Sequence, residues 1–455
     1  MDGKQLRQLK PELELFLERY LPLFGRSENQ PHAVEFVHGL LGAAERRNVE
    51  NIAQAVKGGV VRTMQKFISQ GCWSDAEVLS ELRTHVVEGL GEVAATLNVD
   101  ETGFPKKGVK SVGVKRQYSG TLGRVDNCQV AVMASYCSRR GHTLIDRRLF
   151  LPKEWAHDAV RREEAGVPGG VVFRTKPELA LEMVQSAARE GVPFQWVGGD
   201  SVYGDSPAFV QGIRALEKWY VLDTSSDARV WLSPPRMRPA GRVGRRGGRP
   251  PTKPKPLTKP IPVAEALASL PPSAFRPITV SEGSQGPIVY EYAELTVWFS
   301  EEGLPAEQPE RLLVRRSLGQ EPELKYHRSN APAHIPLPQV ASQRALRWTI
   351  EQDIQAGKGE SGLDEYETRG WIGWHHHTAL SLLALLFLVL QRNRWGEKRA
   401  ADERPPGARA PQTPRRRPPL GRSRNPRVVQ LAHGAKPHRK TLSRTTPPRR
   451  TAATK

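Results

Sequence analysis

The chain has 455 residues, a formal net charge of +20 and an isoelectric point near 10.1. This length allows a sizeable core in two or three domains, and the positive excess indicates a polyanionic partner, nucleic acid ahead of an anionic membrane. No CxxC pair occurs among Cys72, Cys128 and Cys137, which argues against a structural zinc site and a disulfide framework and fits a reducing cytosol.

Residues 1–92 have the pattern of a helical region. Leu13, Leu17 and Tyr20 recur at helical spacing. Two short helices are predicted at 48–57 and 60–69, separated by Gly58-Gly59. Such a pair is compatible with a DNA-binding helix-turn-helix and equally with an ordinary helical bundle.

Residues 93–225 change to alternating strands and helices. Helices are predicted at 176–190 and 206–216, and strands at 93–99, 128–136, 143–150, 194–198 and 219–223. Consecutive short strands followed by strand–helix alternation predict a mixed α/β sheet. Three antiparallel strands followed by helix-linked parallel strands is the order of an RNase H-like core.

Residues 226–340 are predicted to be a β-rich insertion. It begins with a cationic loop rich in Gly, Pro, Arg and Lys over 236–259, a composition that cannot build a core. Strands are predicted at 277–280, 289–299 and 311–316. The core then resumes over 341–395, with helices predicted at 340–358 and 378–392.

The end of the chain is apolar and then strongly basic. Residues 378–390 form an apolar run too short to span a bilayer, so a buried helix is expected. Residues 395–455 hold 17 Lys and Arg against three Asp and Glu, about +14 of the total charge. We expect residues 396–455 to be a disordered basic tail that attracts DNA without reading its sequence.

Two predicted strands deliver an aspartate among glycines at their ends. Asp100 follows the first strand, and Asp200 follows the strand at 194–198. Each aspartate alone is typical of a turn. On neighbouring strands, however, two carboxylates repel unless a proton or a cation lies between them, and Mg²⁺ prefers such oxygen ligands. The pair therefore favours a metal site.

A third carboxylate, Glu351, lies on the helix predicted at 340–358. Arg347 is four residues before it and Lys358 seven after it, so the three share a helix face. Such a stripe is commonly a solvated salt-bridge face. On a helix packed against the sheet, Glu351 could instead complete the metal site, with Arg347 and Lys358 as phosphate contacts.

These stretches together resemble the DDE transposases of bacterial insertion sequences, most closely the insertion-sequence 701 family with its Tyr-Arg-Glu-Lys signature. The likeness extends over roughly residues 45–390. Residues 100–108 and 117–121 are similar to the first-aspartate block, residues 199–204 to the second, and Arg347, Glu351 and Lys358 match the signature's spacing. The signature's tyrosine position is Arg344 here, and Ser201 follows the second aspartate where relatives more often carry glutamate.

The resemblance implies a transposase that cleaves DNA at the element's ends and joins the freed 3′-hydroxyl to target DNA. It implies an RNase H-like core in which Asp100, Asp200 and Glu351 hold two Mg²⁺ ions, with Mn²⁺ as a substitute. It further implies a helical region that recognises the ends, DNA contacts from Lys106, Lys107, Arg347 and Lys358, a homodimer on double-stranded DNA, and a cytoplasmic, nucleoid-associated location without a membrane.

Two other functions fit some of these features. One is an inactive or domesticated relative that binds DNA without cutting it. The other is a glycosidase using Asp100 and Asp200 as acid and nucleophile, against which the basic body argues. The run His375-His376-His377 does not predict a metal site, because adjacent residues on a helix point in different directions.

Overall fold

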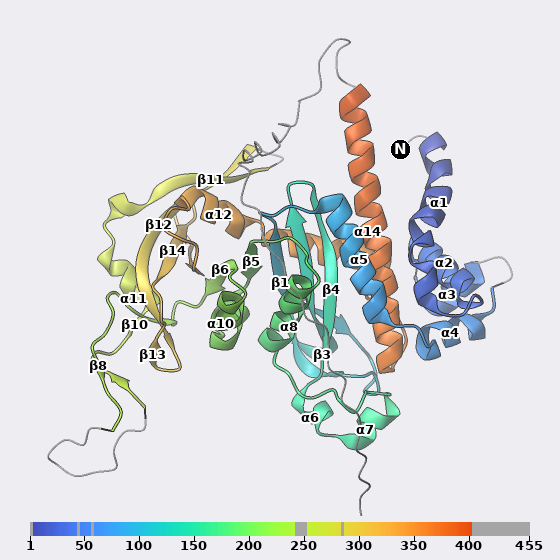
Figure 1. The fold of residues 1–455 in the computed structure, drawn as a ribbon, viewed down its shortest axis with the longest axis horizontal. Helices are drawn as coiled ribbons and strands as arrows, with labels where there is room; N and C mark the ends of the chain where they lie inside the picture. Colours follow the sequence, from blue (N-terminus) through green and yellow to red (C-terminus); the bar gives the residue numbers. More distant parts are fainter. Residues whose placement is uncertain (1–2, 43–45, 56–58, 242–252, 284–285, 403–455) are drawn as a thin grey trace, which may run out of the picture. The chain divides into compact units, whose positions relative to one another are not determined.

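Five strands form the core of one end of a thirteen-stranded sheet in the computed structural model (Figure 1). β1 (Thr96–Pro105), β3 (Arg124–Ser138) and β4 (Gly141–Phe150) pair antiparallel, while β5 (Trp196–Gly199) and β6 (Trp219–Thr224) run parallel to β1. The spatial order is β4-β3-β1-β5-β6. The predicted mixed α/β sheet, with antiparallel strands first and parallel strands after, is confirmed.

The structure describes residues 3–42, 46–55, 59–241, 253–283 and 286–402, which belong to one unit, Met1–Asp402. The expected disordered tail lies almost wholly outside these residues. Its first part is different from the prediction, because residues 396–402 continue the last helix, α14 (Trp371–Asp402). The state of residues 403–455 stays a prediction.

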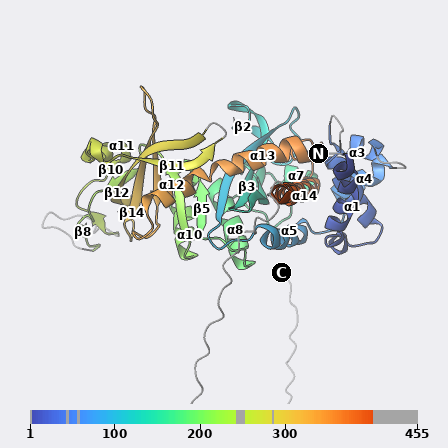
Figure 2. The same ribbon diagram turned by 90° about the horizontal axis from the view of Figure 1, so that it is seen from above.

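Helices cover both faces of the core strands. α8 (Lys176–Arg189), started by a capping box of Thr175 and Glu178, connects β4 to β5, and α9 (Ser201–Gly204) and α10 (Pro207–Ala215) connect β5 to β6. α13 (Trp348–Ser361) lies on the face opposite α8 (Figure 2). Because side chains alternate along a strand, β1 directs Asn98 to the Leu346 carbonyl before α13 and Glu101 to Lys176 of α8.

The N-terminal region is a helical bundle packed on α14. It consists of α1 (Gly3–Glu18), the 3₁₀ turn Leu21–Phe24, α2 (Asn29–Leu40), α3 (Val49–Ala55), α4 (Val61–Gln70) and α5 (Asp75–Leu90). α2, α4 and α5 contact α14. Three apolar side chains of α4 are buried: Met64, Phe67 and Ile68. The apolar face of this short helix therefore packs against the rest of the bundle.

α14 is the core helix of the protein. In the described part of the chain it is the one helix long and apolar enough to cross a membrane, and an 18-residue window within Trp371–Gly396 has a mean hydropathy of 1.4. Of its most apolar window, 89% is buried inside the protein. The prediction of a buried helix is therefore confirmed, although the helix begins at Trp371, seven residues earlier than expected.

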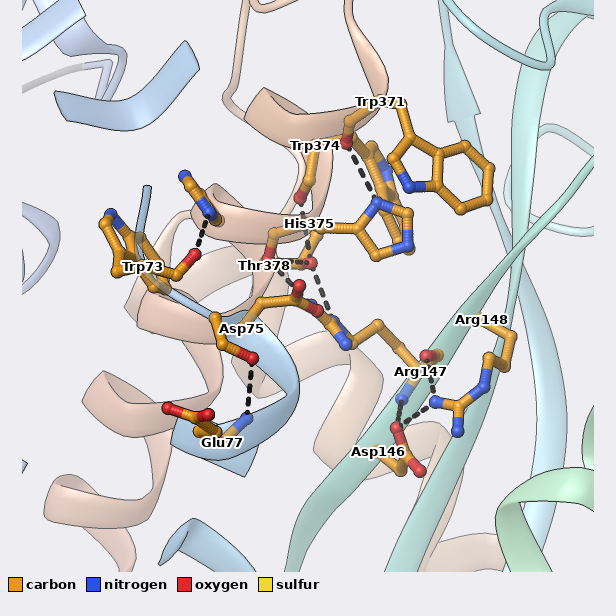
Figure 3. Close-up of polar contacts among 12 residues, drawn as sticks. Trp73, Asp75, Glu77, Asp146, Arg147, Arg148, Trp371, Trp374, His375 and Thr378 are labelled. Atoms are coloured by element: carbon orange, nitrogen blue, oxygen red, sulfur yellow. Dashed lines mark hydrogen bonds and ion pairs between the residues drawn. The ribbon is translucent and has the colours of Figure 1, made fainter. Parts of the chain in front are cut away.

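Buried polar contacts join α14 to β4 and α5 (Figure 3). The guanidinium of Arg147, which is 2% exposed, donates to Thr378 Oγ1 at 2.9 Å, to Asp75 Oδ2 at 2.7 Å and to the His375 carbonyl at 2.7 Å. The three consecutive histidines contact different backbone carbonyls, including those of Trp371, Trp73 and Gly362. They serve packing and do not converge on one ion.

The insertion extends the core sheet rather than interrupting it. β15 (Leu324–Ser329), absent from the sequence prediction, pairs antiparallel with β6 and joins it to β14 (Glu310–Arg316). Beyond β14 the sheet continues through β12 (Gly286–Glu301) to β11 (Arg276–Gly283), β13 (Leu304–Pro305), β7 (Arg229–Trp231) and β10 (Ile261–Pro262). Two-residue strands β8 (Met237–Arg238) and β9 (Lys255–Pro256) flank part of the cationic loop, whose residues 242–252 lie outside the described residues.

A buried ionic cluster fixes the insertion to the core. Arg328 of β15, 3% exposed, donates to Glu310 Oε2 at 3.0 Å and to the Gly204 carbonyl of α9 at 2.9 Å. Arg214 of α10 pairs with Glu301 at 3.0 Å and with Glu310. Because a buried charge is tolerated only when paired and hydrogen-bonded, this cluster requires β12, β14, β15 and the α9–α10 segment to stay together.

Candidate active site

Asp100 lies in the middle of β1, not after its end. The prediction that the strand stops at residue 99 is wrong, because β3 is long enough to pair with β1 from Thr96 through Pro105. On the opposite edge, pairing with β5 stops at Asn98 and Gly198. Asp100 therefore borders the point where β1 and β5 separate, which leaves its carboxylate room on that edge.

Asp200 follows β5 and begins α9, as the glycine-flanked pattern predicted. Its Oδ1 accepts the Val202 N–H at 3.0 Å, which caps the short helix. The parallel pairing is in register, so Asp100 and Asp200 each stand two residues beyond the last paired residues of neighbouring strands. A Cβ on Gly204 would lie 1.9 Å from the Asp223 carbonyl, so only glycine lets α9 approach β6 this closely.

Burial raises the pKa of both aspartates. The pKa of Asp100 rises to about 7, with Asp200 adding to the effect of burial and Arg347 opposing it. The pKa of Asp200 rises to about 6, where the charge of Glu101 adds to burial. Desolvation and neighbouring carboxylates both disfavour the ionised form. The two groups thus occupy an environment in which a further cation is favoured.

The helix predicted at 340–358 is two helices in the structure. α12 (Leu337–Ala345) ends two residues before Arg347, and α13 begins at Trp348. At the junction Arg347 and Thr349 bond to carbonyls three residues back, and the Leu346 carbonyl also accepts Asn98 Nδ2 at 3.1 Å. This tightened junction places Arg347 over β1.

The Arg347 guanidinium connects the predicted carboxylates. Its Nη1 lies 3.1 Å from Asp100 Oδ2, its Nη2 lies 2.6 Å from Glu351 Oε1, and its Nε lies 3.8 Å from Asp223 Oδ2. The side chain is 15% exposed. The structure therefore brings Asp100 and Glu351 together on one arginine, and the alternative of a solvated salt-bridge stripe is wrong for Arg347.

Asp223, near the end of β6, was missed by the sequence reasoning. Its Oδ1 accepts Arg344 Nε at 2.6 Å and lies 2.8 Å from His327 Nδ1, and its Oδ2 accepts Arg344 Nη2 at 3.0 Å. Burial would raise the Asp223 pKa, but the contacts with His327, Arg344 and Arg347 hold it below its usual range. Burial lowers the pKa of His327 to about 4, so a neutral ring donates its Nδ1–H.

One signal could have identified Asp223. It is the penultimate residue of the parallel strand next to β5, and ligands of α/β sheets gather at the carboxyl ends of parallel strands. Arg344, which occupies the tyrosine position of the signature, is the second signal. An arginine that is 8% exposed requires an anionic partner.

The three lysines predicted to contact DNA differ in their contacts and exposure. Lys358 Nζ donates to the Gly103 carbonyl and to Thr121 Oγ1, both at 3.0 Å, so it joins α13 to β1 some distance beyond Arg347. Lys106 Nζ lies 3.6 Å from the centre of the Tyr366 ring and donates to the Tyr366 carbonyl at 3.2 Å. Burial lowers the Lys106 pKa to about 8. Lys107 is exposed.

The oxygen atoms of the three predicted carboxylates suit a hard divalent cation, although they are not arranged to coordinate one ion together. In the described part of the chain, no group of three or more His, Cys, Asp and Glu side chains is arranged to hold a metal ion. Asp100, Asp200 and Glu351 offer the oxygen atoms that Mg²⁺ prefers, and Arg347 stands between two of them. A metal ion would require this arginine to release Asp100 and Glu351.

The raised aspartate pKa values predict a pH-dependent stability. A carboxyl whose folded pKa exceeds its unfolded value stabilises the fold fully below the unfolded pKa, and this contribution is lost as pH rises through the folded pKa. When a chelator removes divalent metal ions, the free energy of unfolding should fall between about pH 4 and about pH 7. The contribution of Asp100 to this fall should be on the order of 3 kcal/mol. Denaturant unfolding at several pH values measures it, and Asp100→Asn/Asp200→Asn should flatten the curve. Equal slopes for both proteins would contradict desolvation of the pair.

Comparisons with known proteins identify relatives of this chain. A family model described as DDE superfamily endonuclease matches residues 19–287. A probable transposase for insertion sequence element IS701, from Microchaete diplosiphon, is 31% identical over 207 residues, which cover 44% of this chain and 51% of that protein. The match thus spans about half of the relative. The NurA nuclease from Sulfolobus solfataricus aligns over 59% of this chain and 80% of its own at 9% identity, with a TM-score of 0.23, which supports no fold assignment.

Proposed function

Because this chain belongs to the DDE superfamily endonucleases, we propose that it is a transposase that cuts DNA strands at the ends of an insertion sequence and joins their 3′-hydroxyls to target DNA. The observation that carries the proposal is the meeting of Asp100 and Glu351 on Arg347, beside Asp200 on the neighbouring strand. The IS701-like relative supports the transposase activity, and the strand order β4-β3-β1-β5-β6 supports an RNase H-like core.

Each residue of the site has a proposed task. Asp100, Asp200 and Glu351 would hold two Mg²⁺ ions, or Mn²⁺ in their place. Such ions activate an attacking water or 3′-hydroxyl and stabilise the leaving oxygen of a phosphodiester displacement. Arg347 would turn its planar fork from the carboxylates to a DNA phosphate, which it can hold through two parallel hydrogen bonds. Lys358, tied to Gly103 and Thr121, would fix α13 on β1 and face the DNA as a point charge.

The remaining proposals follow from the family. The substrate is double-stranded DNA, both at the element's ends and at the target. Lys106 and Lys107 follow β1 and would contact its backbone, Lys107 directly because it is exposed. The N-terminal bundle would recognise the ends, the protein would act as a homodimer on DNA, and its location would be the bacterial cytoplasm at the nucleoid.

Cleavage of the DNA that flanks this reading frame tests the function. The full chain is incubated with labelled flanking duplexes in Mg²⁺, Mn²⁺, Ca²⁺ or chelator, and both strands are sequenced at the break. Nicks that leave a 3′-hydroxyl at a fixed position, formed in Mg²⁺ or Mn²⁺ only, are expected. Tight binding without cleavage in every metal would identify an inactive DNA-binding relative, and absence of both would overturn the proposal.

Arg347→Lys should reduce cleavage despite keeping the charge. Lysine places its charge on a single nitrogen and has no planar fork, whereas Arg347 contacts three carboxylates through three nitrogens. We expect a loss of roughly 10- to 100-fold, in the range of groups that orient metal ligands, and a smaller loss for Lys358→Arg. Single-turnover cleavage rates at fixed Mg²⁺ measure both. Wild-type rates in Arg347→Lys would show that the fork geometry is not used.

A further inference from the structure

A basic groove lies beyond the end of β1, away from the carboxylates. It joins two adjoining cavities of about 530 Å³ and 310 Å³ that share Val109 and Lys110. We call it the β1–β2 groove, after β1 and β2 (Lys115–Ser119), and define it by six of its lining cations: Lys107, Lys110, Lys115, Arg116, Arg161 and Arg369. One wall is made by α6 (Lys153–Ala156) and α7 (Ala159–Glu164), at one end of the core strands (Figure 1).

The groove carries more positive charge than its own carboxylates can neutralise. Glu164 lines it, and Glu154 beside it pairs with Lys115 at 2.5 Å. Within the described ranges, no carboxylate lies at ion-pair distance from Lys110, Arg116 or Arg369. A concave surface with one sign of charge concentrates the opposite charge, so the groove suits a polyanion.

Arg161 and the loop after β1 are held in place before any ligand arrives. The Arg161 guanidinium lies 3.8 Å from the centre of the buried Trp155 ring and donates to the Val109 carbonyl at 3.2 Å. Asn127 Nδ2 donates to the carbonyls of Lys106 at 2.6 Å and Gly108 at 2.9 Å. These contacts order the loop after β1 from both sides, which lowers the entropic cost of binding.

We propose that the β1–β2 groove binds the sugar–phosphate backbone of the DNA duplex whose scissile phosphate lies at Asp100. The inference rests on the proposed function. From Asp100 to Pro105, β1 advances about 17 Å at about 3.3 Å per residue, which equals about five base pairs of a duplex at 3.4 Å each. A duplex that binds at Asp100 and runs along β1 therefore reaches the groove about half a helical turn from the scissile phosphate. A flat membrane surface could not contact Asp100 and the groove in this way.

The salt dependence of DNA binding tests the groove. The full chain and the variant Lys110→Gln/Arg116→Gln/Arg369→Gln are titrated with a labelled flanking duplex in Ca²⁺ at several salt concentrations. Three lost phosphate contacts should make the slope of log K against log salt shallower by up to about 2.7. The matched control is Arg139→Gln/Arg140→Gln/Arg189→Gln, which removes three exposed cations from the β3–β4 turn and α8, away from the groove.

The outcomes separate the groove from the proposed function. A shallower slope in the groove variant alone, with unchanged melting temperatures, supports the inference. Equal slopes in the groove variant and the control, with wild-type binding intact, overturn it and leave the transposase proposal standing. No DNA binding by the wild type overturns both. Loss of binding to vesicles of anionic lipid, with DNA binding unchanged, would assign the groove to a membrane and overturn the inference.

Discussion

Asp100→Asn should abolish metal-dependent cleavage and leave DNA binding intact, and Asp200→Asn and Glu351→Gln should do the same. Each change removes a negatively charged oxygen donor and retains the shape of the side chain. If a metal ion contributes several kcal/mol to the transition state, the loss of one ligand should lower the rate by about a thousandfold or more. Binding should persist, since the variants lose no positive charge.

Single-turnover cleavage and gel-shift titration of the same duplex measure these two effects. Glu360→Gln is the matched control, because Glu360 lies on the same helix as Glu351 and is exposed. Wild-type cleavage by any of the three carboxamide variants would remove that residue from the site.

The sequence predicts the core sheet because its strands are short apolar runs separated by clear turns and capped helices. The run before Asp200 is fully buried and stops at Gly199, so its end could be located. The end of β1 could not be located from the sequence. Residues 101–105 include glycine and proline, and they remain a strand because β3 supplies a complete partner ladder. Strand length there depends on a segment about thirty residues away, which local propensity does not contain.

The environment of the site was predictable only in part. Arg347 and Glu351 are close in sequence, so helical spacing placed them together. Asp223, His327 and Arg344 come from three elements, and they meet only because β15 of the insertion pairs with β6. A prediction that treats the insertion as an interruption cannot bring His327 to Asp223. Likewise, the sequence around Lys106 predicts an unpaired lysine that contacts DNA. It does not reveal that Lys106 packs on Tyr366, which lies 260 residues later in the chain.

Asp223→Ala should destabilise the protein strongly and weaken the site with it. Removing this carboxylate leaves Arg344 buried without its only anion within ion-pair distance in the described residues, and such losses cost about 3–5 kcal/mol. It also removes the third carboxylate near Arg347, which then has only Asp100 and Glu351 as partners. We therefore expect weaker divalent-cation binding, measurable by Mn²⁺ titration of the folded variant. Asp223→Asn should be milder, since an amide oxygen still accepts one bond.

A double-mutant cycle of Asp223→Ala and Arg344→Ala separates this pair from general damage. If the two side chains stabilise each other, the double variant should be more stable than the sum of the single losses predicts, by roughly 1–3 kcal/mol. Denaturant unfolding of all four proteins at one pH supplies the free energies. Arg344→Tyr, which introduces the residue of the family signature, should behave like Arg344→Ala, because a phenol cannot balance the Asp223 charge. Additive losses would mean that the contacts of 2.6 Å and 3.0 Å between Arg344 and Asp223 add nothing to stability, and that the signature position is free to change without consequence for Arg347.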